Sequence, residues 1–245
     1  MKFLLAFILF IFLSLTIDAQ LKNKHVLIFT KNGKGYVHEN IPASIAAFQK
    51  LGIENGFTTD TSTNSALFTE NNLKKYDAII FSNTNNDVFD NEEQRVAFMR
   101  YIQAGGGFMG IHSASGTERN WKWFKLMLGA TFLRHPPFQK FIVHVLDKKH
   151  PAVKNLSSQW ETNDECYLFK EINPSIKVLL VSDISTVKEA DSSKNMMSSF
   201  FQIPTTKYLI PKNKGLLLCV IYRPVADSWV FIPHPVPKEI GNGLS

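Results

Sequence analysis

The feature that most constrains the fold is a triple glycine that separates an amphipathic segment from a short apolar one. Before the glycines at 105–107, Val96, Phe98, Met99 and Ile102 recur at a spacing that covers one face of a helix. Glycine commonly ends helices, and residues 108–112 have the composition of a buried strand. A helix that leads into a buried strand is half of an α/β crossover unit, so the pattern favours a parallel sheet covered by helices.

The same alternation continues on both sides of this unit. Further strands are predicted at residues 25–29, 57–60, 77–81, 141–145, 166–169 and 178–181. Helices are predicted from Pro42 to a stop at Gly52, over 69–75, from a capping box of Asp90 and Glu93, and over 121–128. Strands that alternate with amphipathic helices predict an α/β fold with a mostly parallel sheet covered on both faces.

The first nineteen residues read as a secretory signal peptide and not as part of the fold. Lys2 provides a positive start, residues 3–15 are almost all apolar, and Ala19 offers a small residue at a cleavage point. The alternative is a membrane anchor, although the apolar run is shorter than the roughly 20 residues that span a bilayer. No second segment is long enough to span, so we expect a secreted or periplasmic protein without a stable membrane span.

The last fifty residues differ in character from the rest. Six of the eleven prolines fall at 204, 211, 224, 233, 235 and 237, and no helical period appears after Asn195. Proline at this density interrupts helices and sheet ladders. Residues 216–222 could form one strand, and the remainder is predicted to be disordered. The chain therefore divides into a signal peptide at 1–19, a domain at 24–195 and a diverged tail at 196–245.

The composition narrows the function classes. Hydrophobic residues make up 44% of the chain and charged residues 20%, which is typical of a globular protein. The net charge of +6 comes without a stripe of Lys and Arg interleaved with aromatic residues, so no nucleic-acid partner is predicted. Gly33 and Gly35 match neither the dinucleotide nor the P-loop fingerprint, and the two cysteines form no CxxC pair.

Three histidines follow predicted strands or helices and could meet at one edge of the sheet. His38 comes after the first strand, His112 ends the strand at 108–112, and His135 follows the helix at 121–128. Open α/β sheets bind ligands at the carboxyl ends of their strands, where imidazoles can act as acids and bases or hold a metal. The alternative is that each imidazole only bonds to nearby backbone. A divalent metal such as zinc stays open, because H-E-x-x-H spacing is absent.

Ser113 follows His112 and suggests two different roles. A nucleophile at a sharp turn after a strand is typical of α/β hydrolases and glutamine amidotransferases. Here G-x-S-x-G is absent, and no cysteine stands at the turn. A serine that caps a helix or bonds within a loop is the alternative role.

A carboxylate pair lies among aromatic residues later in the chain. Asp164 and Glu165, with Tyr167 nearby, could hold sugar hydroxyls or supply an acid and a base. Adjacent strand residues point to opposite faces, so at most one carboxylate is expected to serve the site. The tryptophans Trp121, Trp123 and Trp160 could stack on a sugar ring or pack in the core.

Several ordered blocks of the sequence together resemble the ThuA-like (trehalose utilisation) family. These are residues 26–31 (VLIFTK), 36–42 (YVHENIP), 105–115 (GGGFMGIHSAS), 121–124 (WKWF), 133–136 (LRHP) and 163–167 (NDECY). The resemblance runs from about residue 24 to 182. It implies a flavodoxin-like α/β three-layer sandwich, similar to class I glutamine amidotransferase-like domains, in which the elbow cysteine is replaced.

The resemblance also implies a role in disaccharide or keto-sugar metabolism, often in secreted proteins. By position, the family's polar blocks fall on His38, His112, Ser113, His135, Asp164 and Glu165. The chain departs from the family at Cys166, where tryptophan is usual, and after Asn195, where the later histidine blocks are missing. We therefore interpret the tail as diverged or frame-shifted.

These observations give one main hypothesis and two alternatives. The main one is a sugar-processing hydrolase, lyase or isomerase in which His112 is the acid/base group, with His38 and His135 as partners or ligands. A small-molecule sugar would contact Ser113, Asp164, Glu165, Trp121 and Tyr167. The alternatives are a non-catalytic or degenerate carbohydrate-binding member, and amidotransferase or hydrolase chemistry. The oligomeric state and the exact substrate stay open.

Overall fold

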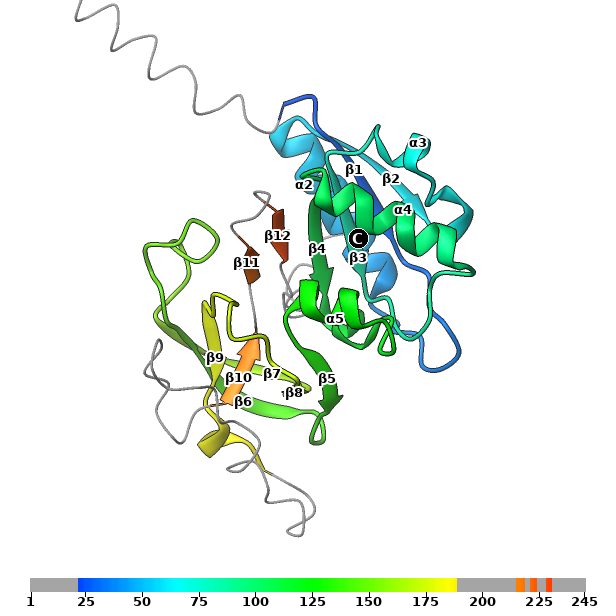
Figure 1. Ribbon diagram of the computed structural model, residues 1–245. Helices are drawn as coiled ribbons and strands as arrows, with labels where there is room; N and C mark the ends of the chain where they lie inside the picture. The colour runs from blue at the N-terminus through cyan, green and yellow to red at the C-terminus, as the bar shows by residue number, and fades with distance from the viewer. Residues whose placement is uncertain (1–21, 189–214, 219–220, 224–227, 231–245) are drawn as a thin grey trace, which may run out of the picture.

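A computed structural model describes residues 22–188, 215–218, 221–223 and 228–230 (Figure 1). The predicted signal peptide and most of the predicted tail lie outside the described residues. Within them, no helix combines the length and the apolar character that crossing a bilayer requires.

The first half of the chain forms a four-stranded parallel sheet in the order β2-β1-β3-β4. Its strands are β1 (His25–Phe29), β2 (Thr58–Ser62), β3 (Ala78–Ser82) and β4 (Gly107–Ile111). Each was predicted to within two residues. The two central strands, β1 and β3, are apolar almost throughout because the sheet is covered on both faces.

Helices cover the two faces of this sheet, which gives the predicted three layers. The helices are α2 (Ile41–Asn55), α3 (Glu70–Leu73), α4 (Glu92–Gln103) and α5 (Lys122–Leu128). Figure 1 shows α3, α4 and α5 on the near side, where Leu27, Phe29 and Phe81 join the main core. Alternate residues such as Val26 and Ile80 form a smaller core with Phe48 of α2 on the other face.

The triple glycine performs the predicted turn from α4 into β4. Gly105 has a φ of +98°, a backbone conformation that glycine adopts without strain. At Gly107 a Cβ atom would lie 3.0 Å from the Cβ of Ala78 and from the backbone oxygen of Asp77. The glycines therefore allow the chain to reverse tightly and β4 to enter the sheet beside β3.

Two predicted helix ends differ from the structure. The helix α2 continues through Gly52 and ends at Gly56, whose φ of +78° is left-handed. The helix α4 is capped by Asn91 and not by Asp90, because the Asp90 carboxylate is paired with Lys31. Gln94 completes the shifted cap, since its side chain accepts a hydrogen bond from the backbone N–H of Asp90 at 2.7 Å.

We expect Asn91→Ala to lower the free energy of unfolding by about 1 kcal/mol, a usual cost of losing a helix cap. The Asn91 side chain accepts a hydrogen bond from the Gln94 N–H at 3.0 Å, and alanine leaves that donor without it. Urea denaturation of the full chain measures the change. Gln103→Ala, exposed at the other end of α4, is the control and should change stability by less than about 0.5 kcal/mol. Equal effects of the two substitutions would contradict the capping role.

The second half of the chain forms further strands that pair antiparallel, not parallel as the alternating pattern suggested. A sheet in the order β10-β9-β6-β7 and a β5-β8 pair follow the first sheet. The strands are β5 (Thr131–Arg134), β6 (Gln139–Val145), β7 (Gln159–Asp164), β8 (Leu168–Lys170), β9 (Leu180–Ser182) and β10 (Gly215–Leu218). No helix of the predicted crossover type separates β6 from β7 or β7 from β8, so these strands join through loops.

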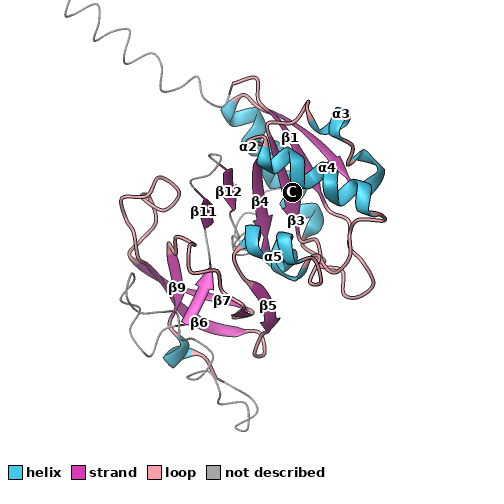
Figure 2. Ribbon diagram, in the orientation of Figure 1, coloured by secondary structure: helices cyan, strands magenta, loops and turns pink. Residues whose placement is uncertain are grey.

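The predicted strand at 216–222 is split between β10 and a hairpin of β11 (Ile221–Arg223) and β12 (Ser228–Val230). The strand β12 of this hairpin lies beside β4 of the parallel sheet. Figure 2 shows that the α-helices gather around the parallel sheet, whereas the second region is built mainly from strands and loops.

Candidate active site at the carboxyl edge of the parallel sheet

His112 stands at the point where β4 ends and the chain turns sharply. Its φ is +51°, a left-handed conformation that is uncommon for a residue other than glycine. A short 3₁₀ helix, His112–Gly116, begins at this residue. The imidazole therefore occupies a strained elbow at the carboxyl edge of the sheet, where strain is often associated with function.

His38 comes to the same place from the loop between β1 and α2. The centroids of the His38 and His112 rings are 4.4 Å apart, with the rings at 65°. Burial lowers the pKa of His38, and the charge of His135 acts in the same direction while Asp164 opposes them. His38 is therefore neutral near pH 7 and carries a nitrogen lone pair.

The second region of the chain supplies the other half of the cluster. Glu165 follows β7, and one of its oxygens lies 3.7 Å from Nε2 of His112. Its other oxygen lies 3.6 Å from Nε2 of His135, which follows β5. Nδ1 of His135 donates to the backbone oxygen of Pro136 at 2.8 Å, which directs Nε2 toward the carboxylate. Glu165 thus stands between two imidazoles.

Tyr167 is buried and contacts both His112 and His135. Its hydroxyl lies 3.1 Å from Nε2 of His112, and its ring stacks on that of His135 with centroids 5.6 Å apart. Burial, and then the negative charges of Glu165 and Asp164, raise the pKa of Tyr167 well above its usual range. The hydroxyl therefore stays protonated and acts as a hydrogen-bond donor.

Buried polar atoms without a hydrogen-bond partner gather at the same edge of the sheet. Among the described residues, they are Asn32 Oδ1, His38 Nδ1, Asn40 Oδ1, Asn83 Oδ1 and Ser113 Oγ. All five belong to segments that follow β1, β3 or β4. Buried polar atoms in folded proteins are usually paired, so this concentration indicates a place built to bind a polar ligand.

A buried ion pair fixes the loops at this edge. Glu118 is 1% exposed, and its carboxylate accepts hydrogen bonds from the backbone N–H groups of Val88 and Phe89 at 2.9 and 3.1 Å. The same carboxylate lies 2.9 Å from Nε of Arg95 on α4. Because these bonds join the segment after β3 to the segment after β4, they hold the elbow loop in place.

The structure brings together five of the eight predicted site residues: His38, His112, His135, Glu165 and Tyr167. Asp164 lies next to them but is 3% exposed, and it accepts the backbone N–H of Glu165 at 2.6 Å. Ser113 is 4% exposed beneath the elbow.

Trp121 is the predicted residue that lies elsewhere. Its aromatic neighbours are Phe89, Phe98, Trp123 and Phe124 of the main core, so the packing alternative describes its contacts.

Three asparagines at the candidate site, Asn32, Asn40 and Asn83, were not predicted from the sequence. Asn83 begins the polar run at 83–86 directly after a predicted strand, which is the pattern that singled out His112.

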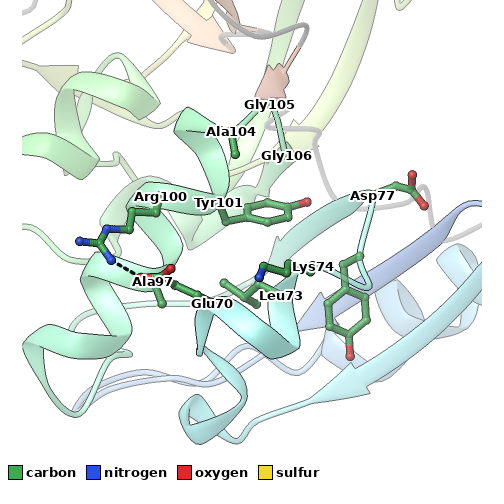
Figure 3. Close-up of a pocket in the computed structure, with 11 residues that line it drawn as sticks. Glu70, Leu73, Lys74, Asp77, Ala97, Arg100, Tyr101, Ala104, Gly105 and Gly106 are labelled. Carbon is green, nitrogen blue, oxygen red and sulfur yellow. Dashed lines mark hydrogen bonds and ion pairs between the residues drawn. The ribbon is translucent and has the colours of Figure 1, made fainter.

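An open groove of about 390 Å³ lies at the opposite edge of the sheet (Figure 3). Asp77 and the glycines at 105–106 line it just before β3 and β4 begin, and an ion pair between Arg100 and Glu70 borders it. It contains no histidine. Ligand sites of open α/β sheets lie at the carboxyl ends of strands, so the imidazole cluster is the better candidate for chemistry.

Comparison with known protein families identifies the family of this chain. Residues 25–208 match the family described as ThuA, trehalose utilisation. The chain belongs to the ThuA family. The resemblance noted in the sequence is confirmed, and family membership implies a role in trehalose utilisation in the broad sense. The ThuA match continues past residue 195, where the sequence analysis ended the domain. None of the curated proteins matches the chain significantly.

Solved ThuA-like structures share the fold. A ThuA-like protein from Bacteroides uniformis ATCC 8492 is 21% identical, with a TM-score of 0.65 over 92% of this chain and 87% of that chain. Another from Parabacteroides merdae ATCC 43184 is 17% identical, with a TM-score of 0.61 over 86% of this chain and 79% of that chain. The predicted α/β fold is therefore confirmed.

Proposed function

We propose that this ThuA-family chain is an exported enzyme that transfers a proton on the oxidised keto form of a trehalose-type disaccharide. The observation that carries the proposal is the convergence of three imidazoles and Glu165, from four separate segments, at the carboxyl edge of the sheet. Imidazoles change protonation near neutral pH and are the commonest general acids and bases. Export, to the periplasm or the exterior, rests on the predicted signal peptide at 1–19.

His135 is the imidazole best suited to move the proton. Its side chain is 36% exposed, whereas that of His112 is 10% exposed and contacts the Tyr167 hydroxyl. The bond from Nδ1 to Pro136 leaves Nε2 to accept a proton, and Glu165 at 3.6 Å stabilises the imidazolium that forms. The proposal therefore assigns proton transfer to His135, with His112, the group that the sequence favoured, as its partner in the cluster.

The reaction follows from the acidity of carbon next to a carbonyl group. Nε2 of His135 would remove the proton from a carbon beside the keto group, and the electron pair would move to the carbonyl oxygen. If the proton returns to the former carbonyl carbon, and the hydroxyl proton of the first carbon passes to the enolate oxygen, the product is an isomer. If instead the enolate re-forms the carbonyl and expels the glycosidic oxygen from the next carbon, the glycosidic bond is cleaved and the leaving oxygen takes the proton from His135. The buried polar atoms of Asn32, Asn83 and Ser113 would bond to sugar hydroxyls.

Covalent catalysis at the elbow has less support. The elbow residue is His112 and not a cysteine or serine. The hydroxyl of Ser113 has no hydrogen-bond partner among the described residues, so no base activates it there. The hydroxyls of Thr84 and Thr117 bond to each other. The Glu118 carboxylate accepts a hydrogen bond from the backbone N–H of Val88. We therefore do not favour amidotransferase or serine-hydrolase chemistry.

The proposal is tested by following proton exchange directly. The full chain is incubated in D₂O with trehalose and with a keto-disaccharide, and NMR monitors deuterium entering the carbon beside the carbonyl and any new product. We expect exchange with the keto-sugar above that of a sample without protein. Binding by calorimetry without exchange or product would contradict the proposal and favour the non-catalytic carbohydrate-binding alternative.

A further inference from the structure

Three side chains of the cluster have the composition of a transition-metal site. His38, His112 and Glu165 each offer one ligand atom, and these atoms all lie within 4.8 Å of one another. They come from three segments, namely the loop after β1, the elbow after β4 and the end of β7. We propose that His38, His112 and Glu165 bind a zinc ion at the carboxyl edge of the parallel sheet.

The distances between the three ligand atoms are slightly longer than those around a bound zinc ion. Ligand atoms around a tetrahedral zinc, with bonds of about 2.0–2.2 Å, are about 3.3 Å apart. The Glu165 oxygen already lies 3.7 Å from Nε2 of His112. The remaining distances are at most 4.8 Å, so rotation of the Glu165 side chain and small shifts of the rings are sufficient.

Burial and hydrogen bonding favour the ligand forms of these groups. Nδ1 of His38 is buried and has no hydrogen-bond partner among the described residues. The His112 ring is held at a strained elbow, with the Tyr167 hydroxyl 3.1 Å from its Nε2. A cation at Nε2 of His112 would displace the Tyr167 hydroxyl from that nitrogen, and the hydroxyl would then donate to the Glu165 carboxylate. Such outer partners orient metal ligands in known sites.

The donor set favours a transition metal, and zinc is the ion that we propose. Two imidazole nitrogens and one carboxylate oxygen suit zinc, whereas calcium and magnesium prefer oxygen ligands only. Three protein ligands leave the fourth tetrahedral position for water or for a substrate oxygen, as in catalytic zinc sites. The carbonyl or hydroxyl oxygen of a sugar is a suitable fourth ligand, and His135 beside Glu165 is left to move the proton. The role of the ion rests on the proposed function, whereas the site itself does not.

Zinc binding is measured on the untagged full chain after treatment with a chelator. Calorimetry with ZnCl₂ and elemental analysis after dialysis should give one ion per chain. We expect His38→Ala, His112→Ala and Glu165→Gln each to weaken the affinity by more than about 100-fold, since even outer-shell partners cost about 10–100-fold. Cobalt(II) titration gives a second readout, because its visible absorption reports the coordination geometry and disappears in the variants.

His144→Ala is the matched control for these substitutions. Nε2 of His144 lies 3.3 Å from a carboxylate oxygen of Asp183, so it is also a partly buried histidine beside a carboxylate. It should bind zinc like the unmodified chain. If a histidine variant does not fold, Glu165→Gln still decides, because the two side chains have the same shape. Affinities that are equal in Glu165→Gln and His144→Ala, or the absence of one-to-one binding, would overturn the site.

One further variant separates the zinc site from the proposed function. His135→Gln removes the proton-transfer group but none of the three ligands, so it should keep zinc affinity within about tenfold of the unmodified chain. Zinc bound at the three residues without any sugar turnover would leave the site standing and reject the proposed function. Turnover that persists in a chain with no measurable zinc would do the reverse.

Discussion

Replacing His135 by glutamine is expected to lower the kcat of keto-sugar turnover by about 10²–10⁴-fold, the usual contribution of a general acid or base. Glutamine keeps a polar side chain of similar reach but cannot take up a proton. KM should change little, because the substitution removes an interaction that matters mainly in the transition state. Steady-state kinetics of the full chain measure both constants.

His144→Gln provides the comparison for this result. His144 also lies beside a carboxylate, that of Asp183, but it belongs to β6 and not to the imidazole cluster. Its kcat should remain that of the unmodified chain. If the two variants retain the same kcat, His135 is not the proton-transfer group. The two free energies of unfolding should also agree, which excludes a loss of activity through misfolding.

Phe81→Ala is expected to lower the free energy of unfolding by about 3–5 kcal/mol, the range for deleting a buried phenylalanine ring. Phe81 lies on β3, is fully buried and has ring centroids of Phe108, Phe29 and Phe98 at 5.1, 5.3 and 5.4 Å. The substitution would leave a cavity where strands and helices meet. The loss is a large fraction of the roughly 5–15 kcal/mol by which domains are usually stable.

Phe138→Ala removes the same side chain from an exposed position and is the matched control. Phe138 is 59% exposed in the turn between β5 and β6, so its loss should cost less than about 0.5 kcal/mol. Urea denaturation, with equal slopes for the variants, gives the comparison. A difference of less than about 1 kcal/mol between the two variants would show that the aromatic cluster does not hold the sheet and helices together.

The parallel half of the fold could be read from the sequence, because its signals are local. Runs such as residues 26–29 are apolar throughout, and the helix that ends at the triple glycine has a clear apolar face. The antiparallel half was predicted only in part: the strands predicted at 141–145, 166–169 and 178–181 correspond to β6, β8 and β9, whereas β5 and β7 were not predicted. The strand β7, with the sequence QWETND, alternates only weakly, and its pairing with β6 depends on contacts between the two strands. The ion pair of Asp90 with Lys31 also engages the carboxylate that was predicted to cap α4, and this pairing depends on tertiary structure.

The candidate site was predictable in composition but not in geometry. His38, His112 and His135 could be chosen because each follows a predicted strand or helix. The position of Glu165 between two imidazoles could not, because it depends on how β7 and β5 meet the parallel sheet. The positive φ of His112 and the burial of Asn83 are likewise products of tertiary structure. Trp121 was predicted to contact the sugar, but in the structure its ring packs on Phe124 of the main core.

The division of the cluster between the two halves of the chain has a consequence for biosynthesis. The imidazoles of His38 and His112 leave the ribosome early, whereas Glu165 and Tyr167 follow more than fifty residues after His112. A nascent chain with only the parallel half would carry two imidazoles of the cluster, those of His38 and His112, but not Glu165. Competence for chemistry is thus acquired late in synthesis, after the scaffold that presents it has had time to form.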